Sequence, residues 1–217
     1  MTRKHDFRRI LCLLFALMLF HPLARAEESS ISSQIARIQQ RLLDWGYLSG
    51  PVDGIFGTST HQAVVAFQKQ HGLTADGKIG PDTASALGVT VSDTLHAGLY
   101  QETELSLLAR LVSGEARGEP YIGQVAVAAV VLNRVRSSAF PDTVSGVIFQ
   151  PGAFDAVWDG QFDQPPTEDA RRAARDALNG WDPTGGCLYY YNPATATNAW
   201  IRTRRIQLTI ARHVFCQ

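Results

Sequence analysis

A short motif, Asp-Gly-x-x-Gly, occurs twice in the first half of this chain, and no other feature restricts its fold as much. The copies occupy residues 53–57 and 76–80, 23 positions apart, and each is followed by a threonine and an alanine at matching places. Asp-Gly is a strong turn signal, and the threonine-containing segment after each second glycine is suited to open a helix. The repeat therefore indicates one supersecondary unit used twice.

Apolar residues at helical spacing flank both turns. One stripe comes from residues 35–43 and a second from residues 63–68, while Pro81 stands where a short third helix would begin. The sequence therefore predicts a three-helix unit of about 60 residues, which is small but sufficient for a core of its own.

The run from Ile35 to Leu87 contains V-D-G-I-F-G, A-V-V-A-F-Q and A-D-G-K-I-G-P-D-T, and it resembles the peptidoglycan-binding type 1 domain family. The resemblance implies a non-catalytic module, residues 27–90, that holds cell-wall glycan or stem peptide. Its candidate wall-contacting residues are Asp53, Phe56 and Asp76. For each of these taken alone, turn formation by the aspartates and core packing by the phenylalanine is the simpler explanation.

The N-terminal 26 residues have the layout of a secretory signal. Four basic residues precede an eleven-residue apolar run, residues 10–20, and Ala24-Arg25-Ala26 forms a small-x-small cleavage site. The apolar run is short for a permanent membrane helix, which makes an uncleaved anchor the weaker alternative. We expect residues 1–26 to be removed and the protein to be exported, with no permanent membrane span afterwards.

Composition and charge exclude several other classes of protein. With 45% hydrophobic and 18% charged residues, the chain is neither disordered nor a coiled coil. Removing residues 1–26 takes five of the 20 basic residues and one of the 20 acidic ones, which leaves 15 against 19 and a net charge of about −4. Such a chain has no basic field to gather nucleic acid or anionic lipid.

The second half opens after a stretch, residues 91–104, that shows no clear period and is expected to be a linker. Apolar residues then recur at helical spacing from Leu105 to Ala116, and a second stripe runs from Tyr121 to Val135. Between the two predicted helices, Gly114, Gly118 and Pro120 interrupt the pattern. We therefore expect two helices joined by a short turn.

Glu115 is a carboxylate on or beside the apolar face of the first of these helices, in its last turn. Desolvation raises the pKa of a carboxyl group, which is what a general acid working near neutral pH requires. A structural glutamate that caps backbone amides or pairs with Arg110 or Arg117 is the alternative. Glu119 is the competing acid; its place between glycine and proline predicts an exposed turn, so it ranks second.

Residues 105–217 resemble the germination-type cell-wall hydrolase family of the spore cortex-lytic enzymes. The resemblance runs through S-G-E-A-R-G-E-P, G-V-I-F-Q-P-G-A-F, A-L-N-G-W-D-P-T-G-G, Y-Y-Y-N-P-A-T-A-T and H-V-F-C. It implies an α+β, mainly helical, lysozyme-like catalytic domain with a small sheet. It also implies Glu115 as the catalytic acid, no cofactor, and lytic transglycosylation of the bond from N-acetylmuramic acid to N-acetylglucosamine. The implied setting is spore-cortex hydrolysis during germination; the sequence identifies no accessory regulatory protein.

The distribution of carboxylates agrees with that reaction. A glycosidase that uses water normally sets two carboxylates about the scissile bond, whereas a transglycosylase needs one, since the 6-hydroxyl of the sugar is the nucleophile. The aspartates at 155, 159 and 163 lie in a loop-like stretch and are expected to be solvated, and Asp182 before Pro183 indicates a turn.

Three alternatives to this reaction are a muramidase, a catalytically silent wall-binding protein and a zinc amidase. The amidase is disfavoured because residues 105–217 contain one histidine, His213, and no metal site is predicted.

Amides bind acetamido groups and aromatic faces stack on sugar rings, so several residues are candidates for substrate contact. They are Glu119, Gln150, Phe154, Tyr191 and Asn192. Strand alternation places Tyr190 opposite to Tyr189 and Tyr191. For the tryptophans at 158, 181 and 200 the sequence does not decide between core and groove.

Export permits a disulfide between the two remaining cysteines, Cys187 and Cys216. We expect it to join a strand at residues 188–191 to the end of a last helix, which the spacing of Ile206, Ile210 and Val214 predicts. Two alternatives are a thiol nucleophile, Cys187 with His213, and the start of a zinc site.

Overall fold

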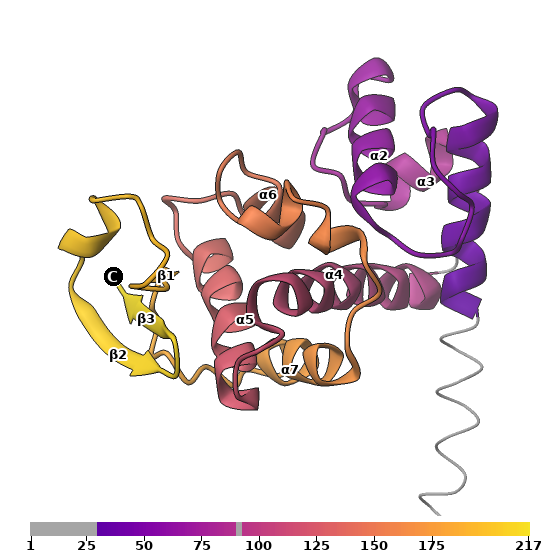
Figure 1. Cartoon of the computed structure of the whole chain (residues 1–217). Helices are drawn as coiled ribbons and strands as arrows, with labels where there is room; N and C mark the ends of the chain where they lie inside the picture. Colours follow the sequence, from indigo (N-terminus) through magenta and orange to yellow (C-terminus); the bar gives the residue numbers. More distant parts are fainter. Residues whose placement is uncertain (1–29, 90–92) are drawn as a thin grey trace, which may run out of the picture.

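The structure, a computed structural model, describes residues 30–89 and 93–217. The predicted signal segment, residues 1–26, lies outside the described residues. A small helical module forms one end of the molecule, and a three-stranded sheet forms the other, with a helical body between them (Figure 1). This arrangement confirms the predicted class, a mainly helical α+β protein in which a small helical domain precedes a domain with a small sheet. Among the described residues no helix is both long enough and apolar enough to cross a membrane.

The module contains the three predicted helices: residues 30–44, α2 (Thr58–Gln70) and α3 (Pro81–Ala86). Their apolar faces meet in a core, in which the largest fully buried side chains are Ile38, Leu42, Phe56, Phe67 and Leu87. Pro81 is the first residue of α3, where its fixed φ suits a helix start and its missing N–H costs nothing. Phe56 is 0% exposed and fills this core, so its side chain does not reach the module surface.

A buried glutamine holds each Asp-Gly turn. Gln39 Nε2 donates to Asp53 Oδ1 (2.8 Å), to the Ile55 carbonyl (2.9 Å) and to Thr60 Oγ1 (3.0 Å), while its Oε1 accepts from the Asp53 and Gly54 amides.

Gln68 repeats the pattern in the second copy. Its Nε2 donates to Asp76 Oδ1 (3.0 Å), to the Lys78 carbonyl (2.8 Å) and to Thr83 Oγ1 (3.1 Å), and its Oε1 accepts from the Gly77 amide. Asp53 and Asp76 each accept a bond from the amide two residues on, as turn-forming aspartates do. In each copy of the repeat, therefore, a buried glutamine side chain supplies the hydrogen bonds that the Asp-Gly turn needs.

The helical body is built from α4 (Asp93–Ala116), α5 (Tyr121–Arg136) and α7 (Glu168–Leu178), which pack on one another. Short segments complete it: α6 (Val144–Ile148), η1 (Asp155–Val157) and η2 (Gln161–Asp163). In α5 every residue from Gly123 to Arg134 is buried, as expected of a helix rich in alanine and valine on all sides. The alanines of α7 at 170, 173, 174 and 177 form its buried face, and Thr167 caps its start by accepting from the Ala170 amide.

The stretch expected to be a linker, residues 91–104, is helical from Asp93 onward and belongs to α4. Its small and polar residues conceal the period, yet Leu99 is 1% exposed and Glu102 pairs with Arg171 of α7 at 2.6 Å. Packing against the module and α7 therefore supports helix where the local pattern is weak.

The predicted last helix is wrong: residues 206–216 form two strands. β2 (Ile206–Ile210) and β3 (His213–Cys216) are antiparallel, and β3 also pairs with β1 (Tyr189–Tyr191), so the strand order is β1-β3-β2. The positions that suggested a helix stripe are divided between two strands: Ile206 and Ile210 lie on β2, whose register shifts between Ile206 and Leu208, and Val214 lies on β3 beyond the turn. Ala211, with φ +46°, makes the turn between β2 and β3.

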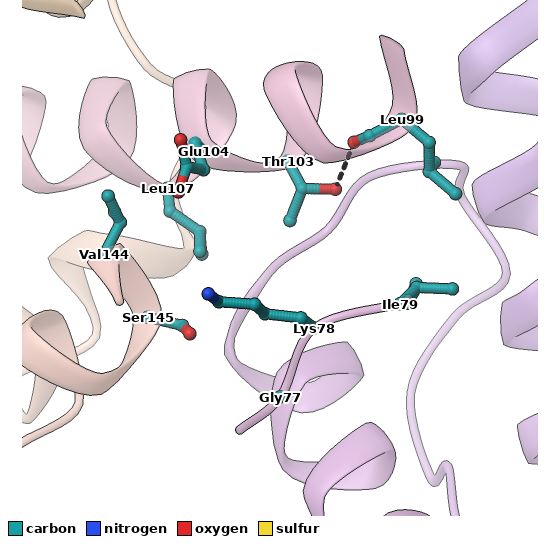
Figure 2. Close-up of a pocket in the computed structure, with 9 residues that line it drawn as sticks. All are labelled: Gly77, Lys78, Ile79, Leu99, Thr103, Glu104, Leu107, Val144 and Ser145. Atoms are coloured by element: carbon teal, nitrogen blue, oxygen red, sulfur yellow. Dashed lines mark hydrogen bonds between the residues drawn. The ribbon is translucent and has the colours of Figure 1, made fainter. Parts of the chain in front are cut away.

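The second Asp-Gly turn docks the module on the helical body. The segment from Gly77 to Ile79 faces Leu99, Thr103 and Leu107 of α4 (Figure 2). Ser145 Oγ of α6 donates to the Asp76 carbonyl at 3.1 Å. The apolar core runs without a break from the module into the body.

His61 is the second docking contact, because its ring stacks on Phe149 at 4.1 Å between centroids. Burial lowers the pKa of His61 to about 4, so the ring is neutral at pH 7. Gly77 has φ +72°, and a Cβ on it would lie 2.2 Å from His61 Nε2, so a larger residue fits neither the turn nor the contact.

We predict that Gln39→Leu lowers the free energy of unfolding by about 1–3 kcal/mol or more, because it leaves buried amides and carbonyls without partners. Urea titration followed by circular dichroism measures the loss. Gln40→Leu is the matched control, since the neighbouring Gln40 is exposed and its side chain bonds to the exposed Asp44. Equal stability of the two variants would contradict a structural role for the Gln39 amide.

Candidate active site

A groove with a volume of about 710 Å³ lies between the helical body and the sheet. Its walls come from the last turn of α4, from α5, from the loop after α6, from β1 with the loop that follows it, and from the β2–β3 turn. All six residues that the sequence proposed for catalysis or substrate contact line this one groove: Glu115, Glu119, Gln150, Phe154, Tyr191 and Asn192.

Glu115 stands half-buried at one side of the groove, in the last turn of α4. Its Oε1 accepts from the Ala156 amide and its Oε2 from the Tyr190 hydroxyl, both at 2.9 Å. A Cβ on the preceding residue, Gly114, would lie 2.5 Å from the Ala156 side chain, so glycine there allows η1 to approach the helix. Three segments remote in sequence thus fix one carboxylate.

Burial raises the pKa of Glu115, and the nearby Asp155 and Asp159 charges raise it further. The hydrogen bonds from Ala156 and Tyr190 oppose this shift without reversing it. Burial and the Glu115 charge raise the pKa of Tyr190 well above its ordinary value, so its hydroxyl remains a donor. The site holds a carboxyl group that takes up and releases a proton at a higher pH than an exposed glutamate does.

Arg134 and Tyr190 are site residues that the sequence did not single out. Arg134 is 8% exposed, lies over the Phe154 ring at 5.1 Å and donates to the Leu188 carbonyl at 2.7 Å. It thereby joins α5 to the aromatic wall of the groove. Strand alternation did separate Tyr190 from Tyr189 and Tyr191, but nothing in the sequence indicates that its hydroxyl meets Glu115.

Glu119 is buried, with 6% exposure, so the predicted exposed turn is wrong. Its two oxygens are engaged by Arg212: Nε donates to Oε1 at 2.7 Å and the backbone amide to Oε2 at 3.3 Å. Arg212 lies in the β2–β3 turn, so its ion pair with Glu119 links that turn to the junction of α4 and α5. It lines the groove as a paired carboxylate.

The remaining aspartates near the groove are placed as their sequence context predicts. Asp155, Asp159 and Asp163 are exposed. Asp182 accepts from the amides of Thr184 and Gly186, both at 2.8 Å, and so closes its own turn.

The candidates for sugar contact differ in how they face the groove. Gln150 is exposed, Tyr191 and Asn192 are half-buried, and Phe154 is 4% exposed. Trp200, which the sequence left undecided, lines the groove at 48% exposure and packs edge-on against Tyr189 at 5.2 Å between centroids. Trp158 and Trp181 are also exposed, but they do not line it.

The predicted disulfide is not formed in the structure: Cys187 and Cys216 are both free and fully buried. Cys187 Sγ donates to the Thr184 carbonyl at 3.3 Å, and burial raises the pKa of both thiols, which favours the protonated form. His213 packs its ring edge-on against Tyr190 at 5.1 Å. Within residues 30–89 and 93–217, no three histidine, cysteine or acidic side chains gather as a metal site would require.

Comparison with known proteins agrees with this architecture. The family described as Cell Wall Hydrolase matches residues 118–216, and the family described as "Putative peptidoglycan binding domain" matches residues 32–87. A spore cortex-lytic enzyme of Bacillus cereus is 42% identical over 88% of this chain and 85% of its own length. This chain belongs to the spore cortex-lytic enzyme family.

Two solved structures are similar to about half of this chain. The catalytic domain of the Bacillus cereus SleB protein is 60% identical, with a TM-score of 0.50, over 52% of this chain and 89% of that domain. The catalytic domain of the germination-specific lytic transglycosylase SleB from Bacillus anthracis is also 60% identical, with a TM-score of 0.51, over 52% of this chain and 93% of that domain. Glu115 lies three residues before the matched hydrolase range.

We predict that Tyr190→Phe raises the pKa of Glu115, because it removes a hydrogen bond that stabilises the carboxylate. Carbon-13 NMR titration of the glutamate carboxyl groups measures this pKa directly. Tyr189→Phe is the control: Tyr189 lies next to Tyr190 on β1, and its hydroxyl makes no hydrogen bond in the described structure. A Glu115 pKa that is unchanged in Tyr190→Phe would contradict the contact.

Proposed function

We propose that this protein is an exported lytic transglycosylase that degrades peptidoglycan, with Glu115 as its single acid and base. One observation carries the proposal: Glu115 is a half-buried carboxyl group in a large groove, with its pKa raised by burial. Of the other carboxylates in the groove, Glu119 is paired with Arg212 and Asp155 is exposed. Membership in the spore cortex-lytic enzyme family supports peptidoglycan as the substrate and germination as the setting.

In the first step the protonated Glu115 gives its proton to the glycosidic oxygen as the bond from C1 of N-acetylmuramic acid breaks. The N-acetylglucosamine end leaves as a 4-hydroxyl, and positive charge develops at C1. Burial favours the protonated form needed at this point, since a charged carboxylate is costly in a desolvated place. Ala156 N–H and Tyr190 O–H then stabilise the carboxylate that the step produces.

In the second step the Glu115 carboxylate takes the proton from the 6-hydroxyl of the same N-acetylmuramic acid, and that oxygen bonds to C1. The product is a 1,6-anhydro end, no water is consumed, and Glu115 is again protonated. A second carboxylate to activate water is not required, which fits a groove whose other buried acid is already paired.

The substrate lies across the groove, between the loop at Gln150 and β1. The exposed Trp200 and the half-buried Tyr191 and Asn192 supply the stacking and hydrogen bonding that sugar rings with acetamido groups accept. Arg134 packs over the Phe154 ring in the wall of the same groove.

We predict that Glu115→Gln lowers glycan cleavage by about 10²–10⁴-fold or more with the fold retained, because the amide keeps the shape and lacks the acidic proton. Release of soluble products from sacculi measures the rate, and circular dichroism checks the fold. Glu168→Gln, at an exposed position, is the control. Near-normal turnover by Glu115→Gln would exclude the assignment and make Glu119 the next residue to test.

Mass analysis of the products separates this reaction from its alternatives. Anhydro ends indicate a transglycosylase, reducing ends a muramidase, freed peptides an amidase, and no products a wall-binding protein.

Because Glu115 must be protonated when the bond breaks, the cleavage rate should fall as the pH rises through the raised pKa of Glu115.

We further propose the division of labour implied by the sequence, in which residues 27–90 hold the wall and residues 105–217 cut it. We predict that residues 105–217 cleave soluble glycan and work poorly on intact sacculi, because tethering raises the local concentration of substrate. A fragment of residues 93–217, which keeps α4 whole, is the control for stability. If both fragments match the full chain on sacculi, the module does not deliver the enzyme to the wall.

A further inference from the structure

A second cavity, which shares no lining residue with the groove, lies between the module and the helical body. It measures about 210 Å³ and is bounded by the first Asp-Gly turn on one side and by α4 and the start of α7 on the other. Its apolar wall includes Ile55, which is 40% exposed, together with Pro165 and Pro166. We call it the interdomain cleft.

Arg110 of α4 lines this cleft and is 5% exposed, and among the residues that the structure describes its Nε–H has no hydrogen-bond partner. Its Nη1 donates to the carbonyls of Phe162 and Gln164 at 3.2 and 3.3 Å, so one edge of the guanidinium is fixed to the body. A buried donor left unpaired is unfavourable, and an arginine fork binds carboxylates with directional bonds. Among the described residues the buried Nε–H is left without an acceptor, on a side chain that lines the cleft.

The residues that line the cleft carry one more positive charge than negative charge. Two of its lining residues are cationic, Arg110 and Arg171, and one is anionic, Glu102, which pairs with Arg171 at 2.6 Å. Asp163 and Asp53 attract the Arg110 guanidinium, but neither bonds to its Nε. A carboxylate would therefore supply a bond that the protein itself does not.

The volume and the apolar wall of the cleft suit the end of a peptide chain. Pockets for whole small molecules span roughly 300–1,000 Å³, a range that includes the groove and excludes the cleft. Its apolar wall suits a small methyl-bearing residue better than a hydroxyl-covered sugar. One side of it belongs to the module matched as a peptidoglycan binding domain.

We propose that the interdomain cleft binds the free terminal carboxylate of a peptidoglycan stem peptide, with Arg110 as its anion-binding residue. This rests on the proposed function, because it assumes that the wall is the substrate. The module and the helical body then hold a peptide together, while the groove holds the glycan.

The test is an NMR titration of the chain from residue 27 onward with a synthetic stem tetrapeptide that ends in D-alanine. The Arg110 Nε–H resonance, assigned by its loss in Arg110→Lys, should move with the free acid and stay in place with the same peptide amidated at its C-terminus. Equal shifts with acid and amide, no shift, shifts confined to groove residues such as Trp200, or the same shift with inorganic phosphate would each overturn the proposal.

Two exposed positions give a matched pair of variants that do not disturb Arg110. Ile55→Glu places a negative charge at the mouth of the cleft and should weaken binding of the acid at least tenfold. Leu43→Glu carries the same change on the first helix, at an equal 40% exposure and away from the cleft, and should bind as the unaltered chain does. Equal affinities would overturn the proposal. Glycan cleavage is assayed separately without the peptide, so a failure of the proposed function is distinguished from a failure of this site.

Discussion

The site depends on holding one carboxyl group half out of water between two donors. Glu115 lies on α4, its amide donor on η1 and its hydroxyl donor on β1. Hydrogen bonds of 2.9 Å at both oxygens are kept only while these three elements hold their places to within roughly a few tenths of an ångström. The buried α5, the contact of η1 at Gly114 and the pairing of β1 with β3 are the packing that meets this requirement.

A buried polar group must also find its hydrogen-bond partners in the module. There the result is a rigid structure, whereas at Glu115 it is a group that can exchange a proton. Gln39 and Gln68 are each 1% exposed, and each satisfies several groups of an Asp-Gly turn, which makes the turns rigid. Glu115 has its two bonds and still keeps a raised pKa, so it remains able to exchange a proton. The buried glutamines, whose side chains bond to several groups of each turn, stabilise the structure. The buried carboxyl of Glu115, whose hydrogen bonds only partly offset its desolvation, can act as an acid.

The sequence was sufficient for features set by local pattern and insufficient for those set by packing. The three module helices, both Asp-Gly turns and the position of Glu115 beside an apolar face follow from spacing over a few residues. Tyr190 could not be assigned to Glu115 because the contact joins residues 75 apart. The last strands were mistaken for a helix because the four-residue spacing of Ile206, Ile210 and Val214 runs across the turn at Ala211 that separates β2 from β3. The start of α4 was mistaken for a linker because its small residues become helical through contacts with the module.

Helix α4 connects the module to the groove as one continuous element. It is continuous from Asp93 to Ala116, the module packs near Leu99 and Thr103, and Glu115 lies in its last turn. At 1.5 Å per residue, the 16 positions from Leu99 to Glu115 correspond to roughly 24 Å. A flexible linker would let a bound module present the groove at many distances, whereas one helix packed at both ends favours a narrow range. In the proposed division of labour, tethering by the module would therefore restrict which bond of a held strand reaches Glu115, so that binding and cutting would be coupled by position as well as by concentration.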